Sequence, residues 1–406
     1  MKKIAGNPYL KKEHEKIFID QVSLDYFFSK FETPILIFIE NRIRDNVRSF
    51  LEIFSPKFEN IQCYYSTKAN FLPEICRIIN SEHLGTEVVG LPELNLTLKI
   101  GVSPNKILVG GPYLPKNLIE KSIEIKVKEI IIYNLNDLKI INSIAERNNH
   151  IQNICIRINS QKYESRLGID LSEENLKFLE KQINELKYIK IKTILSHYGT
   201  QMNNIEFFEK NIKIIAENVK KLKSIGITIE NINLGGGFPE ATIMTNTQLE
   251  KVADEIKRIL DDLNLNYKSI YFEPGRYFVG DAGVFLTEII QIKQNRWVFL
   301  NIGNHICPKF ARCSLRFYNA SRIIAPHKYK TSLCGIIPTD QDVLAKDYFF
   351  TEEIQEGDKV LVTNVGAYCL TFSNRFPYTL PRIFLIKDNE CKQIFDPFIN
   401  KDFSIM

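Results

Sequence analysis

The sequence lacks the features that mark secreted, membrane-spanning and metal-binding proteins. None of its eight cysteines belongs to a C-x-x-C pair and their spacing is irregular, so a zinc ribbon or a disulfide scaffold is a poor match. No apolar run approaches the roughly 18 residues of a transmembrane helix. The opening MKKIAGNPYLKKEHEKIF has no apolar stretch typical of a signal peptide. We therefore expect a cytoplasmic protein without a membrane partner and without a metal.

The chain also carries little excess charge. Its 53 basic and 48 acidic residues leave a net charge of +5, and the excess is spread along the sequence. Nucleic-acid-binding domains usually concentrate basic residues on one face, so we do not expect a nucleic-acid partner. A local basic pocket for an anionic ligand is compatible with this pattern. The length of 406 residues predicts two domains, or one large barrel plus a smaller domain.

Short β-rich runs alternate with longer amphipathic runs. The run PILIFIE (34–40) comes first, and eight more follow at residues 61–69, 85–90, 106–111, 129–134, 154–159, 192–199, 232–238 and 270–276. One of the helix-like stretches between them, TNTQLEKVADEIKRILDDLN, has Asn246 or Thr247 as its expected N-cap. Eightfold alternation predicts a (β/α)8 barrel, with a doubly wound open sheet as the alternative.

The pattern changes after about residue 280. Runs such as SLCGIIP, GDKVLVTNVGAY and PRIFLIKDNECKQIF are typical of antiparallel strands, and long helical patterns become rare. The sequence therefore predicts a barrel domain at residues 34–280 and an all-β domain at residues 281–406. We expect residues 1–33 to form an N-terminal segment that joins the β domain.

Chemically distinctive residues fall at the ends of the predicted barrel strands, where barrel enzymes carry their active sites. Lys68, His197, the triple glycine 235–237, Glu273 and Arg276 all lie there. Each has a simpler interpretation alone: a solvated lysine, a structural histidine, a tight turn. Together they supply an amine, backbone N–H groups and a guanidinium for a phosphate, an acid for a ring nitrogen, and a ring for stacking. That set indicates pyridoxal 5′-phosphate held as a Schiff base.

Six motifs at these positions resemble the fold-type III pyridoxal-phosphate-dependent decarboxylases, the group that contains the diaminopimelate, ornithine and arginine decarboxylases. The motifs are YYSTKAN, SRLGI, SHYGTQ, NLGGGFP, FEPGR and GDKVLVTNVGAY, and they extend over nearly the whole chain. The resemblance implies an alanine-racemase-like barrel, a C-terminal β domain, a small amino-acid substrate and a homodimer with composite active sites.

The resemblance also implies a role for each site residue. Lys68 would carry the cofactor, His197 would stack on its ring, and Glu273 would pair with the ring nitrogen. The implied phosphate ligands are Gly235, Gly236, Gly237, Arg276 and Tyr368. Thr200 stands where the family usually has serine and keeps the hydroxyl.

Two segments depart from the family pattern. The family usually carries G-x-x-C-[DE] in the C-terminal domain, with the cysteine as a candidate proton donor and the acid as a contact for the substrate's distal amine. Here those positions are Pro338 and Thr339, and Cys334 is out of register. Cys307-Pro308 replaces the arginine–proline pair that contacts a distal carboxylate in the diaminopimelate enzymes. The sequence thus argues against diaminopimelate and gives little support to ornithine or arginine.

Three hypotheses follow from this combination. The first is a specialised decarboxylase with an unusual substrate, free or tethered. Its candidate substrate contacts are Thr339, Asp340 and Cys334, and its candidate proton donors are Cys334, Cys369, Asp340 and water. The second is another reaction at Cα, such as racemisation. The third is a non-catalytic paralogue that binds the cofactor or a partner subunit, against which the complete barrel set argues.

Overall fold

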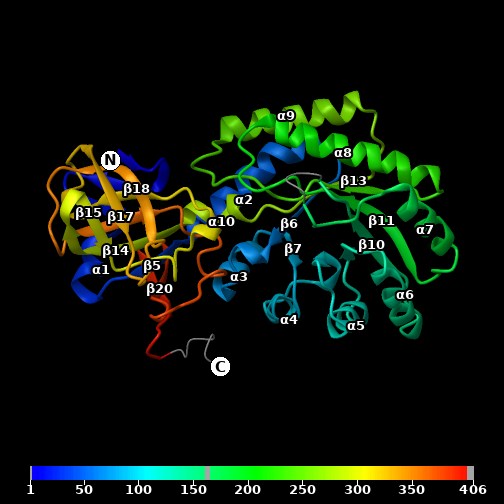
Figure 1. Cartoon of the computed structure of the whole chain (residues 1–406), viewed down its shortest axis with the longest axis horizontal. Helices are drawn as coiled ribbons and strands as arrows, with labels where there is room; N and C mark the ends of the chain where they lie inside the picture. Colours follow the sequence, from blue (N-terminus) through cyan, green and yellow to red (C-terminus); the bar gives the residue numbers. More distant parts are fainter. Residues whose placement is uncertain (1, 161–164, 400–406) are drawn as a thin grey trace. The chain divides into compact units, whose positions relative to one another are not determined.

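The computed structural model describes residues 2–160 and 165–399, which form two compact units. The barrel unit comprises Val47–Pro239 and Ile243–Gly275. The β unit comprises the residues up to Asn46, the short stretch Glu240–Thr242 and the residues from Arg276 onward. Each unit contains its own sheet system, and each is described separately below (Figure 1).

Eight parallel strands close the barrel, in chain order, with the last strand paired to the first. They are β6 (Ile61–Ser66), β7 (Gly85–Val88), β8 (Ile107–Gly110), β9 (Glu129–Ile132), β10 (Gln152–Arg157), β11 (Ile189–Leu195), β12 (Asn231–Asn233) and β13 (Ser269–Phe272). The predicted (β/α)8 barrel is confirmed, and the doubly wound alternative is wrong because β13 pairs with β6 and leaves no open edge.

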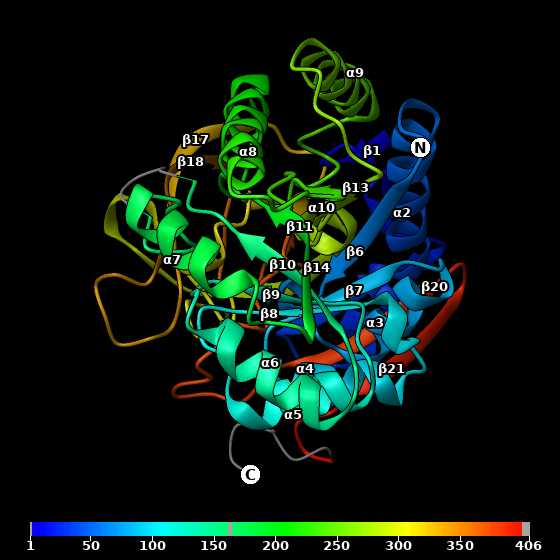
Figure 2. The ribbon, with the colours of Figure 1, turned by 90° about the vertical axis from the view of Figure 1, so that its right-hand side faces the viewer.

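Helices surround these strands, beginning with α2 (Glu40–Phe54), whose Phe50 and Phe54 pack against Phe272 of β13 (Figure 2). The other helices follow β6 to β12 in turn. They are α3 (Pro73–Ser81), α4 (Leu91–Lys99), α5 (Lys116–Glu124), α6 (Asp137–Arg147), α7 (Glu173–Ile183), α8 (Ile205–Ser224) and α9 (Asn246–Asp262). Helix α9 begins one residue earlier than expected, because Thr245 forms a capping box with Gln248 and is itself the N-cap. No helix within residues 2–160 and 165–399 is long and apolar enough to cross a membrane.

The β unit contains a four-stranded sheet and a nine-stranded sheet. The first is formed by β1 (Lys2–Ile4), β2 (Asn7–Glu13), β3 (Lys16–Ile19) and β4 (Val22–Ser23), followed by α1 (Leu24–Lys30). The second contains β5 (Ile35–Ile39), β14 (Gly283–Lys293), β15 (Trp297–Leu300), β16 (Arg316–Asn319), β17 (His327–Cys334), β18 (Val343–Thr351), β19 (Lys359–Thr363), β20 (Arg382–Lys387) and β21 (Glu390–Phe395). The predicted C-terminal β domain is confirmed, with the single-turn α10 (Arg276–Val279) before it.

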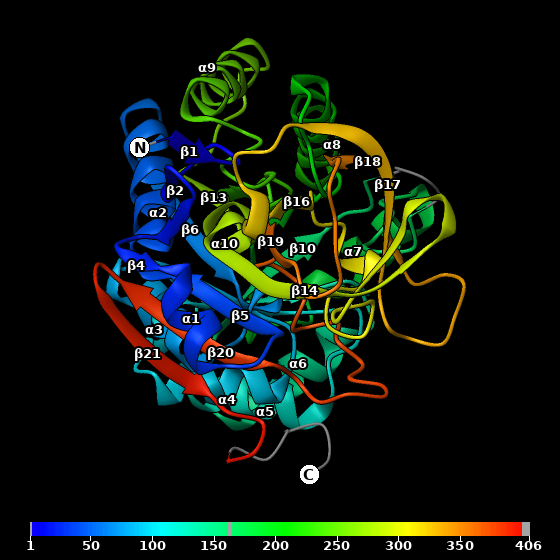
Figure 3. The ribbon, with the colours of Figure 1, turned by 90° about the vertical axis from the view of Figure 1, so that its left-hand side faces the viewer.

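Strand β5 corrects one expected boundary. The sequence analysis placed residues 34–40 in the barrel domain, but β5 pairs antiparallel with β14 and parallel with β20 (Figure 3). Its five residues are fully buried. The chain leaves the β unit only after Asn46, within α2 (Glu40–Phe54). Strands β14 and β20 pair with both of its edges, and the complete burial of its side chains shows that both of its faces are covered as well.

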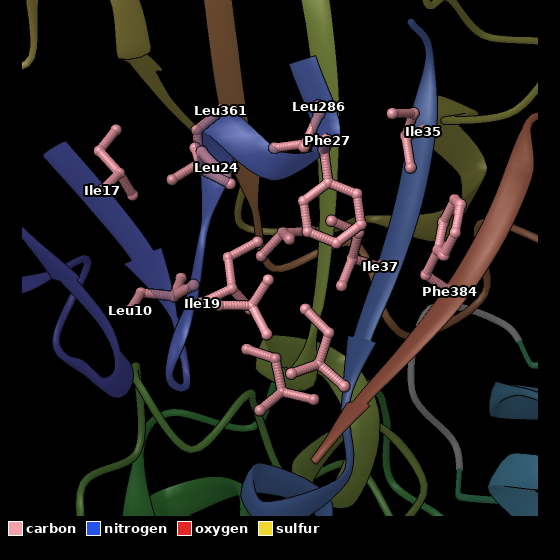
Figure 4. Packing of buried hydrophobic residues seen from close by; sticks show 14 of the residues in the cluster. Leu10, Ile17, Ile19, Leu24, Phe27, Ile35, Ile37, Leu286, Leu361 and Phe384 are labelled. Atoms are coloured by element: carbon pink, nitrogen blue, oxygen red, sulfur yellow. The ribbon is translucent and has the colours of Figure 1, made fainter. Parts of the chain in front are cut away.

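A single apolar cluster joins the N-terminal segment to this sheet (Figure 4). Phe27 of α1 packs edge-on against Phe384 of β20, with ring centroids 5.4 Å apart. Leu10, Ile19, Ile37 and Leu286 belong to the same cluster and are not exposed. Burying each such side chain stabilises the unit by roughly 1.5–3 kcal/mol.

Candidate active site

Lys68 lies directly after the first barrel strand, in the 3-10 turn Thr67–Ala69. Its Nζ lies 2.6 Å from Glu87 Oε2 and donates to Ser66 Oγ at 2.7 Å. Glu87 is only 3% exposed, whereas the Lys68 side chain is 40% exposed. The amine is therefore held on one side by a buried carboxylate and remains accessible on the other, which suits a nucleophile that must meet a carbonyl.

Glu273 follows the last barrel strand and carries a carboxyl with an unusual proton affinity. Burial first, and the nearby Glu87 carboxylate second, raise its pKa to about 7 against the opposing effects of Lys68 and a hydrogen bond from Asn233. Asn233 Nδ2 donates to Glu273 Oε1 at 2.7 Å, and both side chains are buried. Near neutral pH this acid can both hold and release a proton, as acid–base chemistry requires.

Arg157 and Tyr133 complete the polar ring at this end of the barrel. Arg157 Nη1 donates to the Tyr133 hydroxyl at 2.5 Å, and its guanidinium lies 4.6 Å from the Tyr133 ring centre. The positive charge of Arg157 lowers the pKa of Glu273. Arg157 and Lys68 therefore both act on the Glu273 carboxyl. They come from opposite sides of the closed barrel, because Arg157 lies on β10 and Lys68 follows β6.

The glycine loop after β12 lies against His197, which follows β11. The N–H of Gly236 donates to His197 Nδ1 at 3.3 Å, and the N–H of Gly235 donates to Asn233 Oδ1 at 2.8 Å. Gly235 and Gly237 have φ values of +66° and +96°. A Cβ on Gly235 would lie 2.9 Å from His197 Nδ1. Glycine is thus required both by backbone conformation and by the histidine, and a phosphate-binding role for the loop stays a prediction.

Thr200 lies in the same β11–α8 loop and is exposed. Nothing in its surroundings tests the hydroxyl role that the resemblance implies, so that role also stays a prediction.

Within the β unit, Arg276 is held by a buried polar cluster. Its Nη1 lies 3.1 Å from Glu240 Oε1, and its Nη2 donates to the Ala311 carbonyl at 2.6 Å. The Tyr368 ring lies 4.8 Å from the guanidinium carbon, and Tyr368 has a strained φ of +68°. The Arg276 Nε is buried and has no hydrogen-bond partner among the described residues. The guanidinium is thus held on three sides and keeps one donor of the kind that binds anions.

The three candidate substrate residues line one cavity of about 770 Å³ in the β unit. Cys334 ends β17 and is 4% exposed, and burial raises its pKa to about 11. Thr339 and Asp340 lie in the exposed turn that follows. Trp297 and Phe299 contribute to the same cavity. Cys369, another candidate proton donor, is buried elsewhere in this unit, beside Cys313.

Sequence reasoning missed Glu87, Asn233 and Arg157. Glu87 is a charged residue inside the apolar run GTEVVG, and Arg157 is a charged residue inside the apolar run ICIRIN. Both signals were present, because a charge in an otherwise buried strand needs a partner. Asn233 directly precedes the glycine loop and carried no comparable signal.

The family model described as "Pyridoxal-dependent decarboxylase, pyridoxal binding domain" matches residues 41–280, more than half of the chain. The chain belongs to this family. The predicted enzyme class, a pyridoxal-phosphate-dependent decarboxylase, and the predicted cofactor are confirmed.

Relatives of this decarboxylase match it over most of its length. It is 24% identical to a diaminopimelate decarboxylase of Staphylococcus aureus over 94% of this chain and 95% of that protein. It is 26% identical to an L-glutamyl-[BtrI acyl-carrier protein] decarboxylase of Niallia circulans, over 87% of this chain and 88% of that one. The crystal structure of a diaminopimelate decarboxylase from M. jannaschii has the same fold, with a TM-score of 0.87 at 23% identity, covering 97% and 96% of the two chains.

The residues present fit pyridoxal 5′-phosphate. The cofactor needs an amine for its aldehyde and an acid near its ring nitrogen, and the barrel supplies Lys68 beside Glu87 and Glu273 beside Asn233. Four strands of one closed sheet, β6, β7, β12 and β13, provide these groups, as expected for a site built on rigid elements.

Proposed function

We propose that this decarboxylase removes the α-carboxyl group of an amino acid whose side chain ends in a neutral, extended group, such as the thioester or amide of a carrier. The observation that carries the proposal is the pairing of Lys68 with Glu87 near the buried Glu273, together with the neutral residues at the two positions where the family reads substrate charge. A homodimer with composite sites stays a prediction.

The cofactor supplies an aldehyde that captures amines and a ring that draws electrons from Cα. Lys68 would hold the cofactor, and Glu87 would accept the proton that the ammonium must lose before it can react. Glu273 would keep a proton on the ring nitrogen, and the hydrogen bond from Asn233 fixes the carboxylate orientation. His197, held by the Gly236 amide, would cover the ring face.

The phosphate is assigned to the glycine loop, Thr200, Arg276 and Tyr368 by family resemblance. The buried Arg276 guanidinium with its Tyr368 cover supports part of this assignment. Because Arg276 lies only three residues after Glu273 in the sequence, the ring acid and the phosphate ligand would come from one short segment.

The substrate proposal rests on charge. Thr339 is neutral where the family has an acid for a distal ammonium, and Cys307 is neutral where the diaminopimelate enzymes have an arginine. A distal charge buried without its partner costs more than the roughly 1–3 kcal/mol of an unpaired neutral group, so a charged side chain is disfavoured. The Niallia circulans relative, whose name gives an L-glutamyl carrier-protein substrate, supports a carrier-bound alternative.

The cofactor assignment is tested by chemical trapping. The enzyme is loaded with pyridoxal 5′-phosphate, reduced with borohydride and digested, and the labelled peptide is identified by mass spectrometry. We expect the label on Lys68 and none in Lys68→Ala, with CO2 release also lost. Lys57→Ala serves as the control, since Lys57 lies outside the strand ends and pairs with Asp254. Label on another lysine, or full activity of Lys68→Ala, would refute the assignment.

The substrate class is tested by CO2 release from a panel. The panel contains diaminopimelate, lysine, ornithine, arginine, free glutamate and an L-glutamyl pantetheine thioester. We expect kcat/KM for the thioester to exceed that for diaminopimelate by about 100-fold, the equivalent of about 2.7 kcal/mol. Faster turnover of any amino acid with a charged distal group would overturn the substrate proposal and leave the decarboxylase assignment intact.

A further inference from the structure

Three thiols lie together in the β unit. Cys313 Sγ is 3.6 Å from Cys369 Sγ, which in turn is 3.9 Å from Cys307 Sγ. Cys307 and Cys369 are 3% and 1% exposed, whereas Cys313 is partly exposed. The described residues contain no group of three or more side chains with the geometry of a metal site. A redox role is therefore the more direct interpretation of this cluster.

Glu240 holds the Arg276 guanidinium on one side, and the other two chain segments that hold it end at these thiols. The Ala311 carbonyl, which accepts from Arg276 Nη2 at 2.6 Å, lies two residues before Cys313. Tyr368, whose ring covers the guanidinium, directly precedes Cys369. Cys313 Sγ also lies 4.0 Å from Arg276 Nη1. Movement of either sulfur would therefore displace a contact of Arg276.

The two segments are already linked. The Cys313 thiol donates to the Ala367 carbonyl at 3.3 Å, so the 311–313 turn and the 366–369 turn touch at the sulfur itself. A disulfide requires its sulfurs about 2.05 Å apart. Closing the present gap between Cys313 and Cys369 therefore draws the two turns together, and the carbonyl and the ring that hold Arg276 move with them.

We propose that Cys313 and Cys369 form a reversible disulfide that loosens the Arg276 cradle and weakens cofactor binding. The binding effect rests on the proposed phosphate role of Arg276, whereas the disulfide itself does not. A peroxide is the oxidant. Its O–O bond breaks as the partly exposed Cys313 sulfur is oxidised to a sulfenic acid, and one water leaves. The Cys369 sulfur then attacks the sulfenic sulfur and the S–S bond forms. The sulfenic hydroxyl leaves as a second water, with the proton of the Cys369 thiol. Two electrons pass from the thiols to the peroxide, and a dithiol reductant reverses the reaction.

The disulfide is detected on the purified, cofactor-loaded enzyme. Hydrogen peroxide is added at low excess, free thiols are alkylated, and the protein is digested without reductant for mass spectrometry. We expect a peptide pair joined through Cys313 and Cys369, lost after dithiothreitol and absent from Cys313→Ser and Cys369→Ala. Cys391→Ser is the matched control, because Cys391 is a partly buried thiol outside the cluster, and it should give the same linked peptides as the wild type.

Cofactor affinity is measured on the same samples by equilibrium dialysis against pyridoxal 5′-phosphate. We expect oxidation to weaken binding about tenfold, comparable to losing one charge-assisted hydrogen bond, with recovery on reduction and no change in Cys313→Ser. By reciprocity, saturating cofactor should disfavour the disulfide by the same factor in a glutathione buffer.

Each possible result decides a separate claim. Stepwise oxidation of Cys313 with no link to Cys369, or a Cys307–Cys369 link in its place, overturns the disulfide. A Cys313–Cys369 link that leaves cofactor affinity unchanged overturns its action through Arg276. Failure of the reduced enzyme to bind the cofactor would refute the proposed function, while the mass-spectrometric result would still accept or reject the disulfide.

Discussion

Replacing Gly237 with alanine should destabilise the barrel even without any ligand. The backbone there has φ +96°, and an added Cβ would lie 2.2 Å from the Gly199 carbonyl oxygen and 2.8 Å from the Met202 methyl. A left-handed conformation costs an L-residue about 1–2 kcal/mol, and overpacking adds about 1–3 kcal/mol. The Met202 N–H donates to the Gly237 carbonyl at 2.8 Å, which limits relaxation. We expect a total loss of about 2–5 kcal/mol.

Gly226 provides the matched control. It also has a left-handed backbone, with φ +81°, but an added Cβ there would meet nothing within 4 Å. Gly226→Ala should therefore cost only the conformational part, about 1–2 kcal/mol. The difference between the two variants isolates the close approach of the two loops from the backbone requirement that both glycines share.

Urea unfolding of the cofactor-free protein measures both losses. Far-UV circular dichroism reports mainly the barrel, which contains α3–α9, whereas the fluorescence of the chain's one tryptophan, Trp297 on β15, reports the β unit. Gly237→Ala should lower the circular-dichroism midpoint clearly more than Gly226→Ala does. If the two variants lose the same stability, the loop contact does not explain the glycine, and its phosphate role would become the better explanation.

Three further changes test other parts of the molecule. Glu129 is buried at the start of β9, and burial raises its pKa from 4.5 to about 7. Because the folded protein favours the protonated form of Glu129, the free energy of unfolding should fall as pH rises from about 4.5 through 7. At about 1.4 kcal/mol per pKa unit, the loss of stability amounts to about 3 kcal/mol. Urea unfolding at pH 5 and pH 8 should show that Glu129→Gln removes this part of the loss. If the variant keeps the pH dependence of the wild type, Glu129 is not its source. Asn233→Leu removes a donor to the Glu273 carboxylate. The pKa of that carboxyl should rise by about one unit, which corresponds to one modest hydrogen bond. The pH dependence of kcat/KM measures this shift, and an unshifted profile argues against the assigned contact. Thr200→Ser should retain cofactor affinity while Thr200→Ala loses a few-fold in equilibrium dialysis, and equal affinity of the two would reject the hydroxyl role.

The barrel was predictable because its strands are local signals. Each of the eight apolar runs is followed by an amphipathic run, and this alternation has few structural solutions. The run at 34–40 was misplaced because the same local signal marks a strand but not its sheet. Its partners, β14 and β20, lie hundreds of residues away in sequence and are chosen by pairing that no short pattern encodes. The expected strand at 232–238 shortens to β12 because the positive φ of Gly235 and Gly237 ends it.

The site was predictable where one residue type at a strand end implies one function, as for Lys68 and Glu273. Glu87 was not, because its role depends on the register that sets it beside Ser66 in the β6–β7 pair. Arg157 was missed because it acts through its charge on Glu273. The two residues lie at the ends of strands that are far apart in the sequence and that closure of the barrel brings together. The cavity at Cys334, Thr339 and Asp340 likewise depends on how the turn after β17 folds, which composition alone does not specify.

Strand β5 has a consequence for how the protein is made. Its neighbours β14 and β20 are synthesised only after the whole barrel, since residues 40–282 lie between β5 and β14. At roughly 5–20 residues per second, the ribosome needs about 10–50 s for that stretch. During this interval ILIFI, which is fully buried in the finished sheet, has no native partner, and such a segment is prone to aggregate. Until β14 and β20 emerge, this apolar segment is exposed unless a chaperone or the first four strands cover it.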